Sequence, residues 1–93
     1  MAAGTAPRLT LVSREGCHLC EQGRAVVERV AAAEDVGWVE VDVDTDPELR
    51  RRFTDRVPVV LVDGAERDFG WLDEERLRRA LQGRRWWQRA RVR

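Results

Sequence analysis

The first half of this 93-residue chain alternates between strand-like and helix-like segments, and this alternation limits the fold more than any other feature. Residues 9–13 form a short apolar run that predicts a strand, and residues 17–33 carry apolar side chains at helical spacing. Residues 38–43 then place a valine at every second position, which is typical of a strand. A strand, a helix and a strand within about 35 residues indicate a right-handed βαβ unit with parallel strands.

The middle of the chain predicts a short helix followed by a buried strand. Asp46-Pro47-Glu48 combines an N-cap residue, a proline at the first helical position and an acid in the first turn, so we expect a helix over residues 47–53. Residues 57–62 are the most apolar run of the sequence. Such a run is typical of a central strand that is buried on both faces.

The last part of the chain predicts a hairpin and a closing helix. Asp63-Gly64 favours a tight turn, so residues 65–69 should return as an antiparallel strand. Asp73 is expected to cap a final helix that ends near Leu81, with Gly83 as its C′ residue. The sequence therefore predicts an α/β fold in the order βαβ, short helix, ββα.

Cys17 and Cys20 are the only cysteines, and they stand three positions apart at the start of the first predicted helix. This spacing is typical of a pair that cycles between dithiol and disulfide. The unpaired N–H groups and the dipole at a helix N-terminus stabilise an anion, so Cys17 is expected to carry the reactive thiolate. Two other interpretations stay open, namely a pair of metal ligands and an inert pair of small buried residues.

The composition fits one soluble globular domain. The formal net charge is zero, with 37% charged and 43% hydrophobic residues, and no apolar run reaches the length of a membrane span. The first seven residues lack the basic and apolar regions of a secretory signal, and small secreted domains commonly hold several disulfides. We therefore expect a cytoplasmic monomer that does not bind membranes.

The chain is divided here into an N-terminal extension over residues 1–7, one domain over residues 8–82 and a basic tail over residues 83–93. The tail holds five arginines and Trp86-Trp87 but no acid. Interleaved Arg and Trp can bind nucleic acid, but the arginines of the domain are balanced by acids. We predict terminal packing or disorder for the tail and no nucleic-acid partner.

Three short motifs resemble a known family. They are the segment Ser13–Cys20, the tripeptide Arg56-Val57-Pro58 before a strand, and Phe69-Gly70 before the last helix. In this order they resemble the glutaredoxins, and more closely the small bacterial glutaredoxin-like proteins, over about residues 8–81. The resemblance implies a thioredoxin fold with a four-stranded mixed sheet flanked by helices. It also implies a cis peptide bond before Pro58, close to Cys17.

The resemblance further implies a substrate site. In that family the residue before the cis proline offers its backbone to the substrate, and a glycine near the last strand lines the pocket for glutathione. The implied substrate-binding residues of this chain are Arg14, Val57, Pro58, Gly70 and Asp73. The usual Pro-Tyr between the cysteines is replaced here by His18-Leu19, and the usual Gly-Gly pair is replaced by Phe69-Gly70.

Two further residues are candidate modulators of the cysteine pair. His18 is interpreted either as a group that stabilises the thiolate or as an exposed spacer. Arg56 is interpreted either as a cation that steers an acidic substrate or as a solvated charge. Trp38 and Trp71 are expected to pack on the core, with a place at the rim of the substrate groove as the alternative for Trp71.

We therefore predict a thiol–disulfide oxidoreductase in which Cys17 is the nucleophile and Cys20 the resolving thiol. Its substrates would be disulfides of proteins or of small thiols, and its reductant glutathione, another low-molecular-weight thiol or a reductase. No resident cofactor or metal is expected. The alternatives are a module that binds a metal or an iron–sulfur cluster, and a thioredoxin-fold interaction domain without turnover.

Overall fold

The computed structural model describes residues 7–92, with side chains described for residues 7–83. Its elements follow the predicted order and confirm the α/β class. They are β1 (Leu9–Ser13), α1 (His18–Glu34), β2 (Trp38–Asp42), the 3-10 turn η1 (Val43–Thr45), α2 (Pro47–Phe53), β3 (Val59–Val62), β4 (Ala65–Phe69) and α3 (Glu74–Val92).

The four strands form one mixed sheet in the order β2-β1-β3-β4. β1 pairs parallel with β2 and antiparallel with β3, and β3 pairs antiparallel with β4. The β3–β4 turn contains Asp63 at φ 53° and Gly64 at φ 87°. Positive φ at both central residues gives the turn that matches the twist of a hairpin, and glycine adopts it without a steric cost. The predicted hairpin is confirmed.

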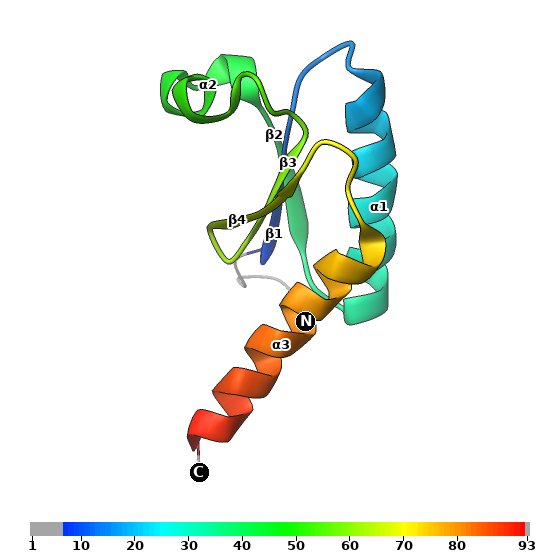
Figure 1. Ribbon diagram of the computed structural model, residues 1–93, viewed down its shortest axis with the longest axis vertical. Helices are drawn as coiled ribbons and strands as arrows, with labels where there is room; N and C mark the ends of the chain where they lie inside the picture. The colour runs from blue at the N-terminus through cyan, green and yellow to red at the C-terminus, as the bar shows by residue number, and fades with distance from the viewer. Residues whose placement is uncertain (1–6, 93) are drawn as a thin grey trace.

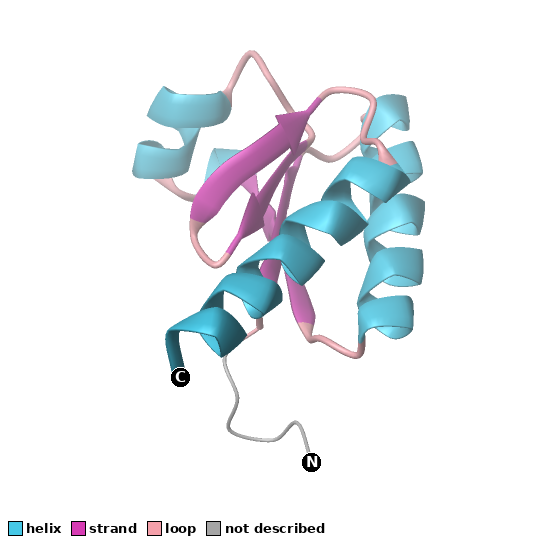
Figure 2. Cartoon of the chain, turned by 60° about the horizontal axis from the view of Figure 1, so that its bottom comes forward, coloured by secondary structure: helices cyan, strands magenta, loops and turns pink. Residues whose placement is uncertain are grey.

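Helices cover the two faces of the sheet unequally (Figures 1 and 2). α1 and α3 lie on one face, where the larger apolar cluster is found, and the short α2 lies on the other. A hydrophobic staple stabilises the start of α3, because Leu72 and Leu77 on either side of the Asp73 cap are both buried in the larger cluster. The cysteine pair lies at the end of the sheet where β1 leads into α1.

The predicted end of the last helix is wrong. α3 does not end near Leu81 with Gly83 as its C′ residue but continues to Val92, beyond the end of the sheet (Figure 1). A glycine inside a helix costs only about 1 kcal/mol, and no proline follows Gly83 to break the helix. The side chains of Trp86 and Trp87 lie outside the described residues.

Candidate functional site

Cys17 is the N-cap residue of α1. Its backbone is extended, with φ −99° and ψ 113°, and its Sγ accepts a hydrogen bond from the Cys20 N–H at 3.1 Å. The sulfur therefore takes the place that a serine or aspartate oxygen commonly occupies at a helix start. Cys17 is half-buried and Cys20 is completely buried, and both are free thiols. Cys17 is therefore partly accessible from outside, whereas Cys20 is not.

Burial changes the acidity of the inner thiol. It raises the pKa of Cys20 to about 11, helped by a hydrogen bond to Cys17 and by the repulsion of a negative charge there. A backbone contact with Arg14 and the guanidinium charge of Arg24 act weakly in the opposite direction. The two thiols thus occupy different environments. As long as neither cysteine is in a disulfide, the Cys20 thiol stays protonated at neutral pH.

The peptide bond between Val57 and Pro58 is cis, and the buried proline ring packs against α1. A Cβ added to Gly23 would lie 3.3 Å from Pro58 Cγ, so this glycine permits the close approach of the helix. Among the residues that the structure describes, no backbone hydrogen bond is found for the N–H or carbonyl of Val57. These two groups are available to pair with the main chain of an extended segment.

Gly70 follows β4 and is attached to the proline loop. Its N–H donates to the carbonyl of Pro58 at 2.9 Å, and its φ of 75° is one that glycine adopts readily. Gly70, Val57 and Pro58 therefore lie together next to α1, as the resemblance implies. Their contact with a substrate stays a prediction.

The guanidinium of Arg14 is held by other residues. It donates twice to the Asp44 carboxylate, at 2.8 and 2.9 Å, and it also donates to the carbonyl and the hydroxyl of Thr54 at 3.2 and 2.9 Å. All three of its nitrogens are used. This geometry favours a bracing role, in which Arg14 ties the loop before Cys17 to the end of α2, over direct contact with a substrate.

Asp73 caps α3 as predicted, because its carboxylate accepts the Arg76 N–H at 3.0 Å. This bond lowers the pKa of the Asp73 carboxyl. The carboxylate thus has a structural partner, and its contact with a ligand amino group stays a prediction.

Asp68 and Gln22 hold the segment between β4 and α3, and sequence reasoning missed both. The Asp68 carboxylate accepts the backbone N–H groups of Phe69 at 2.9 Å and Asp73 at 3.1 Å. The Gln22 amide donates to the carbonyl of Leu72 at 3.2 Å and accepts its N–H at 3.3 Å. No sequence signal points to the bonds between Gln22 and Leu72, since these two residues are 50 positions apart.

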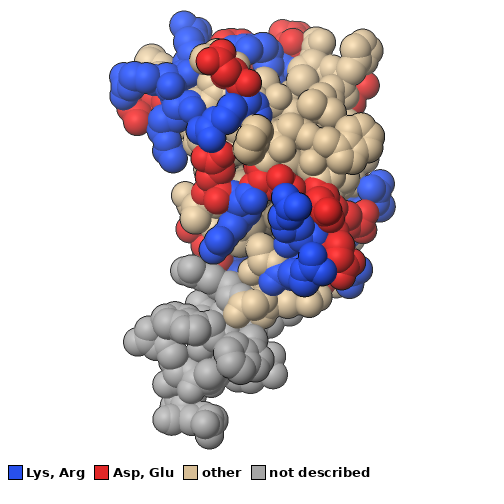
Figure 3. Space-filling view, in the orientation of Figure 1, with Lys and Arg blue, Asp and Glu red and all other residues tan. Residues whose placement is uncertain are grey.

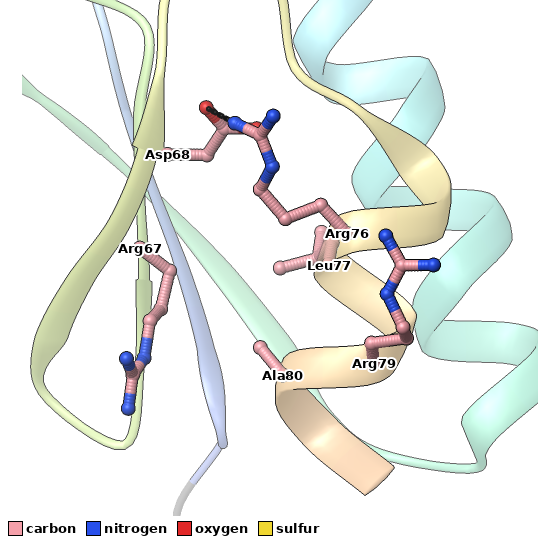
Figure 4. A pocket seen from close by; sticks show the side chains of 6 residues that line it. All are labelled: Arg67, Asp68, Arg76, Leu77, Arg79 and Ala80. Carbon is pink, nitrogen blue, oxygen red and sulfur yellow. Dashed lines mark hydrogen bonds and ion pairs between the residues drawn. The ribbon is translucent and has the colours of Figure 1, made fainter. Parts of the chain in front are cut away.

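The Asp68 side chain also lines a hollow between β4 and α3 (Figure 4). Arg76 extends toward Asp68 and pairs with it at 3.4 Å, whereas Arg67 points away from that pair (Figure 4). The hollow contains neither cysteine. Its lining residues are Arg67, Asp68, Arg76, Leu77, Arg79 and Ala80.

The two candidate modulators have different surroundings. The His18 side chain is 99% exposed, and its Nδ1 lies 4.0 Å from the Glu21 carboxylate, which favours the exposed-spacer interpretation. Arg56 donates to the Glu66 carboxylate at 2.9 Å and to the Arg52 carbonyl at 3.1 Å. Its guanidinium carbon also lies 5.6 Å from the centre of the Phe69 ring. Arg56 is thus attached to the end of β4 near the proline loop.

The two tryptophans were expected to pack on the core, and only one of them does. Trp38 packs against the larger apolar cluster, whereas Trp71 is 70% exposed. Leu72 takes the buried position in the segment after Gly70, packed in the larger cluster, and leaves its neighbour Trp71 outside. Trp71 lines a hollow beside α1, and its place at the rim of a substrate groove stays a prediction.

A polar network lies behind the buried thiol. Arg24 donates to both oxygens of Glu40 at 2.8 and 2.6 Å, and Ser13 Oγ donates to the same carboxylate at 2.6 Å. The Arg24 bonds lower the pKa of Glu40. Glu21 and Glu28 stand at helical spacing from Arg24 on α1, but the hydrogen-bonded partner of Arg24 is Glu40 on β2.

Neither a cluster of metal ligands nor a membrane-spanning helix is present in the part of the chain that the structure describes. Within residues 7–83, no three His, Cys, Asp or Glu side chains are grouped so that they could hold a metal ion. None of the described helices is both long and apolar enough to cross a membrane.

Comparison with known proteins places this geometry in a family. The family model of the Glutaredoxin-like domain (DUF836) matches residues 8–82. The chain belongs to this glutaredoxin-like family. Uncharacterised proteins of Mycobacterium tuberculosis and Mycobacterium bovis are 35% identical to it over 77 residues, which cover 77% of this chain and 79% of each relative.

Solved structures agree with the thioredoxin fold of this glutaredoxin-like protein. A structural-genomics protein from X. campestris is 33% identical with a TM-score of 0.67, covering 81% of this chain and 96% of that one. A protein from Nitrosomonas europaea is 30% identical with a TM-score of 0.66, covering 83% and 94%. A mutant thioredoxin from Halobacterium salinarum is 28% identical with a TM-score of 0.61, covering 81% and 71%. Fold and family together suggest a redox-type role.

Proposed function

We propose that this glutaredoxin-like protein catalyses thiol–disulfide exchange through Cys17 and Cys20. One observation carries the proposal, namely that the accessible Cys17 sulfur caps α1 and accepts the Cys20 N–H at 3.1 Å. A backbone donor and the positive end of the helix dipole both stabilise negative charge on that sulfur. The thiolate is the form of cysteine that attacks disulfides.

The reaction begins when the Cys17 thiolate attacks one sulfur of a substrate disulfide. A new bond forms to Cys17, the substrate bond breaks, and the departing sulfur leaves as a thiolate that takes a proton from water. Cys20 then loses its proton and attacks Cys17 Sγ. This step forms the Cys17–Cys20 disulfide and releases the second substrate thiol, so two electrons pass from the protein to the substrate.

A second disulfide exchange returns the protein to its dithiol form. We propose glutathione, another low-molecular-weight thiol or a reductase as the electron donor, and protein or small-molecule disulfides as substrates. A single closely spaced pair fits a reducing cytoplasm, in which it would cycle instead of serving as a permanent cross-link. The protein needs no resident cofactor for this chemistry.

Trapping of the intermediate tests the proposal. Cys20→Ser, mixed with bis(2-hydroxyethyl) disulfide, should accumulate a mixed disulfide on Cys17 that mass spectrometry detects and that disappears on reduction. Cys17→Ser should form no such adduct, and the wild-type protein should end with an internal disulfide. Absence of adducts in Cys20→Ser would refute the proposal.

The alternative of a metal or cluster module predicts a different result. Because the described residues offer only the two thiols, such a site would need ligands from a second chain or a small thiol. Stoichiometric zinc, or an iron–sulfur absorption band, in protein purified without oxygen would favour it. An interaction domain without turnover would instead leave both thiols reduced in the presence of disulfide.

A further inference from the structure

Large apolar side chains are exposed around the cysteine pair. Among the described residues, four such side chains are exposed, and three of them belong to the segments that form the site. Leu19, between the two cysteines, is 36% exposed, while Phe69 and Trp71, on either side of Gly70, are 53% and 70% exposed. Exposed apolar groups of this size mark interaction surfaces, and these three belong to the start of α1 and to the segment that Gly70 joins to the proline loop. The uncharged area beside α1 is visible in Figure 3.

The backbone holds Trp71 in this exposed position. Its neighbour Leu72 is buried and forms two hydrogen bonds with the side chain of Gln22 on α1. A hollow of about 320 Å³ lies between Trp71 and α1, and Gln22, Val26 and Arg29 form part of its lining. This volume lies at the lower end of the range for small-molecule sites, so it suits one large side chain and not a cofactor.

The opposite side of the site is basic. Residues 47–56, which contain α2, hold four arginines against two acids. Arg52 is exposed and takes part in none of the ion pairs found among the described residues. Arg56 joins the two sides, because its guanidinium carbon lies 5.6 Å from the Phe69 ring. Figure 3 shows the basic groups over α2, next to the uncharged area.

Arg14 holds the basic side of the site next to the nucleophile. It connects the loop before Cys17 to Thr54 at the end of α2, and it also binds Asp44. The basic ridge formed by residues 47–56 is therefore held beside the loop before Cys17. The apolar surface is held separately, because Gln22 on α1 binds the backbone next to Trp71. A partner whose disulfide reaches Cys17 must place one flank on each of them.

We propose, as an extension of the proposed function, that the preferred substrate is a polypeptide disulfide flanked by an aromatic side chain on one side and acidic side chains on the other. The aromatic group would cover Trp71 and enter the hollow beside it, and the acids would face Arg52 and Arg56. A second copy of this chain fits less well. A two-fold interface centred on Cys17 would bring the basic ridges of both copies into the same contact.

Synthetic peptides test this preference. Each peptide carries an internal disulfide in Cys-Gly-Gly-Cys, with Phe or Ala on one side and Glu-Glu or Lys-Lys on the other, made in both orders. Reduced protein is mixed with excess oxidised peptide, the reaction is stopped with acid, and reduced peptide is measured by chromatography. Bis(2-hydroxyethyl) disulfide, which is small and uncharged, reports the basal exchange reaction.

We expect the Phe/Glu peptide to react about tenfold faster than the Ala/Lys peptide in one of the two orders. Trp71→Ala should remove the preference for Phe, and Arg52→Glu should reverse the preference for Glu. Arg79→Glu, on α3, is the matched charge control and should change neither. Arg52→Glu and Arg79→Glu should reduce bis(2-hydroxyethyl) disulfide at the wild-type rate, and Trp71→Ala should still reduce it.

The outcomes separate this inference from the proposed function. Equal rates for all peptides, together with normal reduction of bis(2-hydroxyethyl) disulfide, would overturn the inference and leave the oxidoreductase intact. Failure to reduce any disulfide would overturn both. Self-association that Arg52→Glu or Trp71→Ala abolishes, without any peptide preference, would assign the surface to a second copy and also overturn the inference.

Discussion

The acidity of Cys20 gives a quantitative test of the site. Burial raises the pKa of this thiol to about 11, so at pH 7 only about one Cys20 in ten thousand is a thiolate. An unperturbed thiol, with a pKa of about 8.5, is ionised in about one molecule in thirty. Attack by Cys20 on the mixed disulfide should therefore accelerate with pH throughout the neutral range.

The experiment is an ultraviolet titration of thiolate absorbance on Cys17→Ser, in which Cys20 is the only thiol. The chain contains no tyrosine, so no phenol ionises in the same pH range. Burial stays in this variant but the charged neighbour is lost, so we expect the Cys20 pKa to remain above that of an ordinary thiol and not to exceed about 11. Circular dichroism on the same samples shows whether the protein is folded at each pH.

The raised pKa of Cys20 also makes the stability of the fold depend on pH. A pKa that is higher in the folded than in the unfolded state contributes stability below the unfolded value of about 8.5, and this contribution is lost as the pH rises toward about 11. The protein should therefore unfold at lower denaturant concentration as the pH rises through that window. A thiol titrating near 8.5 in folded Cys17→Ser would refute the burial argument.

Three further predictions concern the contacts that hold the site. Asp68→Ala should cost about 1–3 kcal/mol in urea unfolding, because the N–H groups of Phe69 and Asp73 lose their acceptor; an unchanged midpoint would contradict this. Arg24 lowers the pKa of Glu40, so this carboxylate stabilises the fold above its unfolded pKa of about 4.3 and loses that effect as the pH falls. Glu40→Gln should flatten the acid limb of the stability curve. Gly23→Ala should leave the protein about 1–3 kcal/mol less stable than the matched Gly83→Ala, because only the first added methyl meets Leu72 at 3.1 Å and Pro58 at 3.3 Å.

The sequence was sufficient for the features that depend on local patterns. The βαβ unit, the Asp63-Gly64 turn and the Asp73 cap each rest on a few neighbouring residues whose backbone preferences agree with the fold. The cysteine spacing likewise placed both thiols at the start of α1. These features need no knowledge of which distant segments meet.

The features that the sequence did not predict depend on long-range contacts. Arg24 has acids at helical spacing on α1, yet it pairs with Glu40 on β2, because the sheet brings that carboxylate beneath the helix. Trp71 and Leu72 are both apolar neighbours in sequence, and only the direction of the backbone after Gly70 decides which is buried. The end of α3 is the local exception, because Gly83 is a weak helix breaker when no proline follows it and α3 continues to Val92.

The paired hydrogen bonds between Gln22 and the Leu72 backbone have a consequence for affinity. Fixing the backbone of one flexible residue costs about 1–2 kcal/mol of conformational free energy, so ordering residues 69–73 only upon binding would cost roughly 5–10 kcal/mol. The free protein has already ordered this segment during folding. A substrate therefore binds without this ordering cost, so a small contact area is sufficient for specific recognition. A small contact area also allows the reduced product to dissociate quickly, as each catalytic cycle requires.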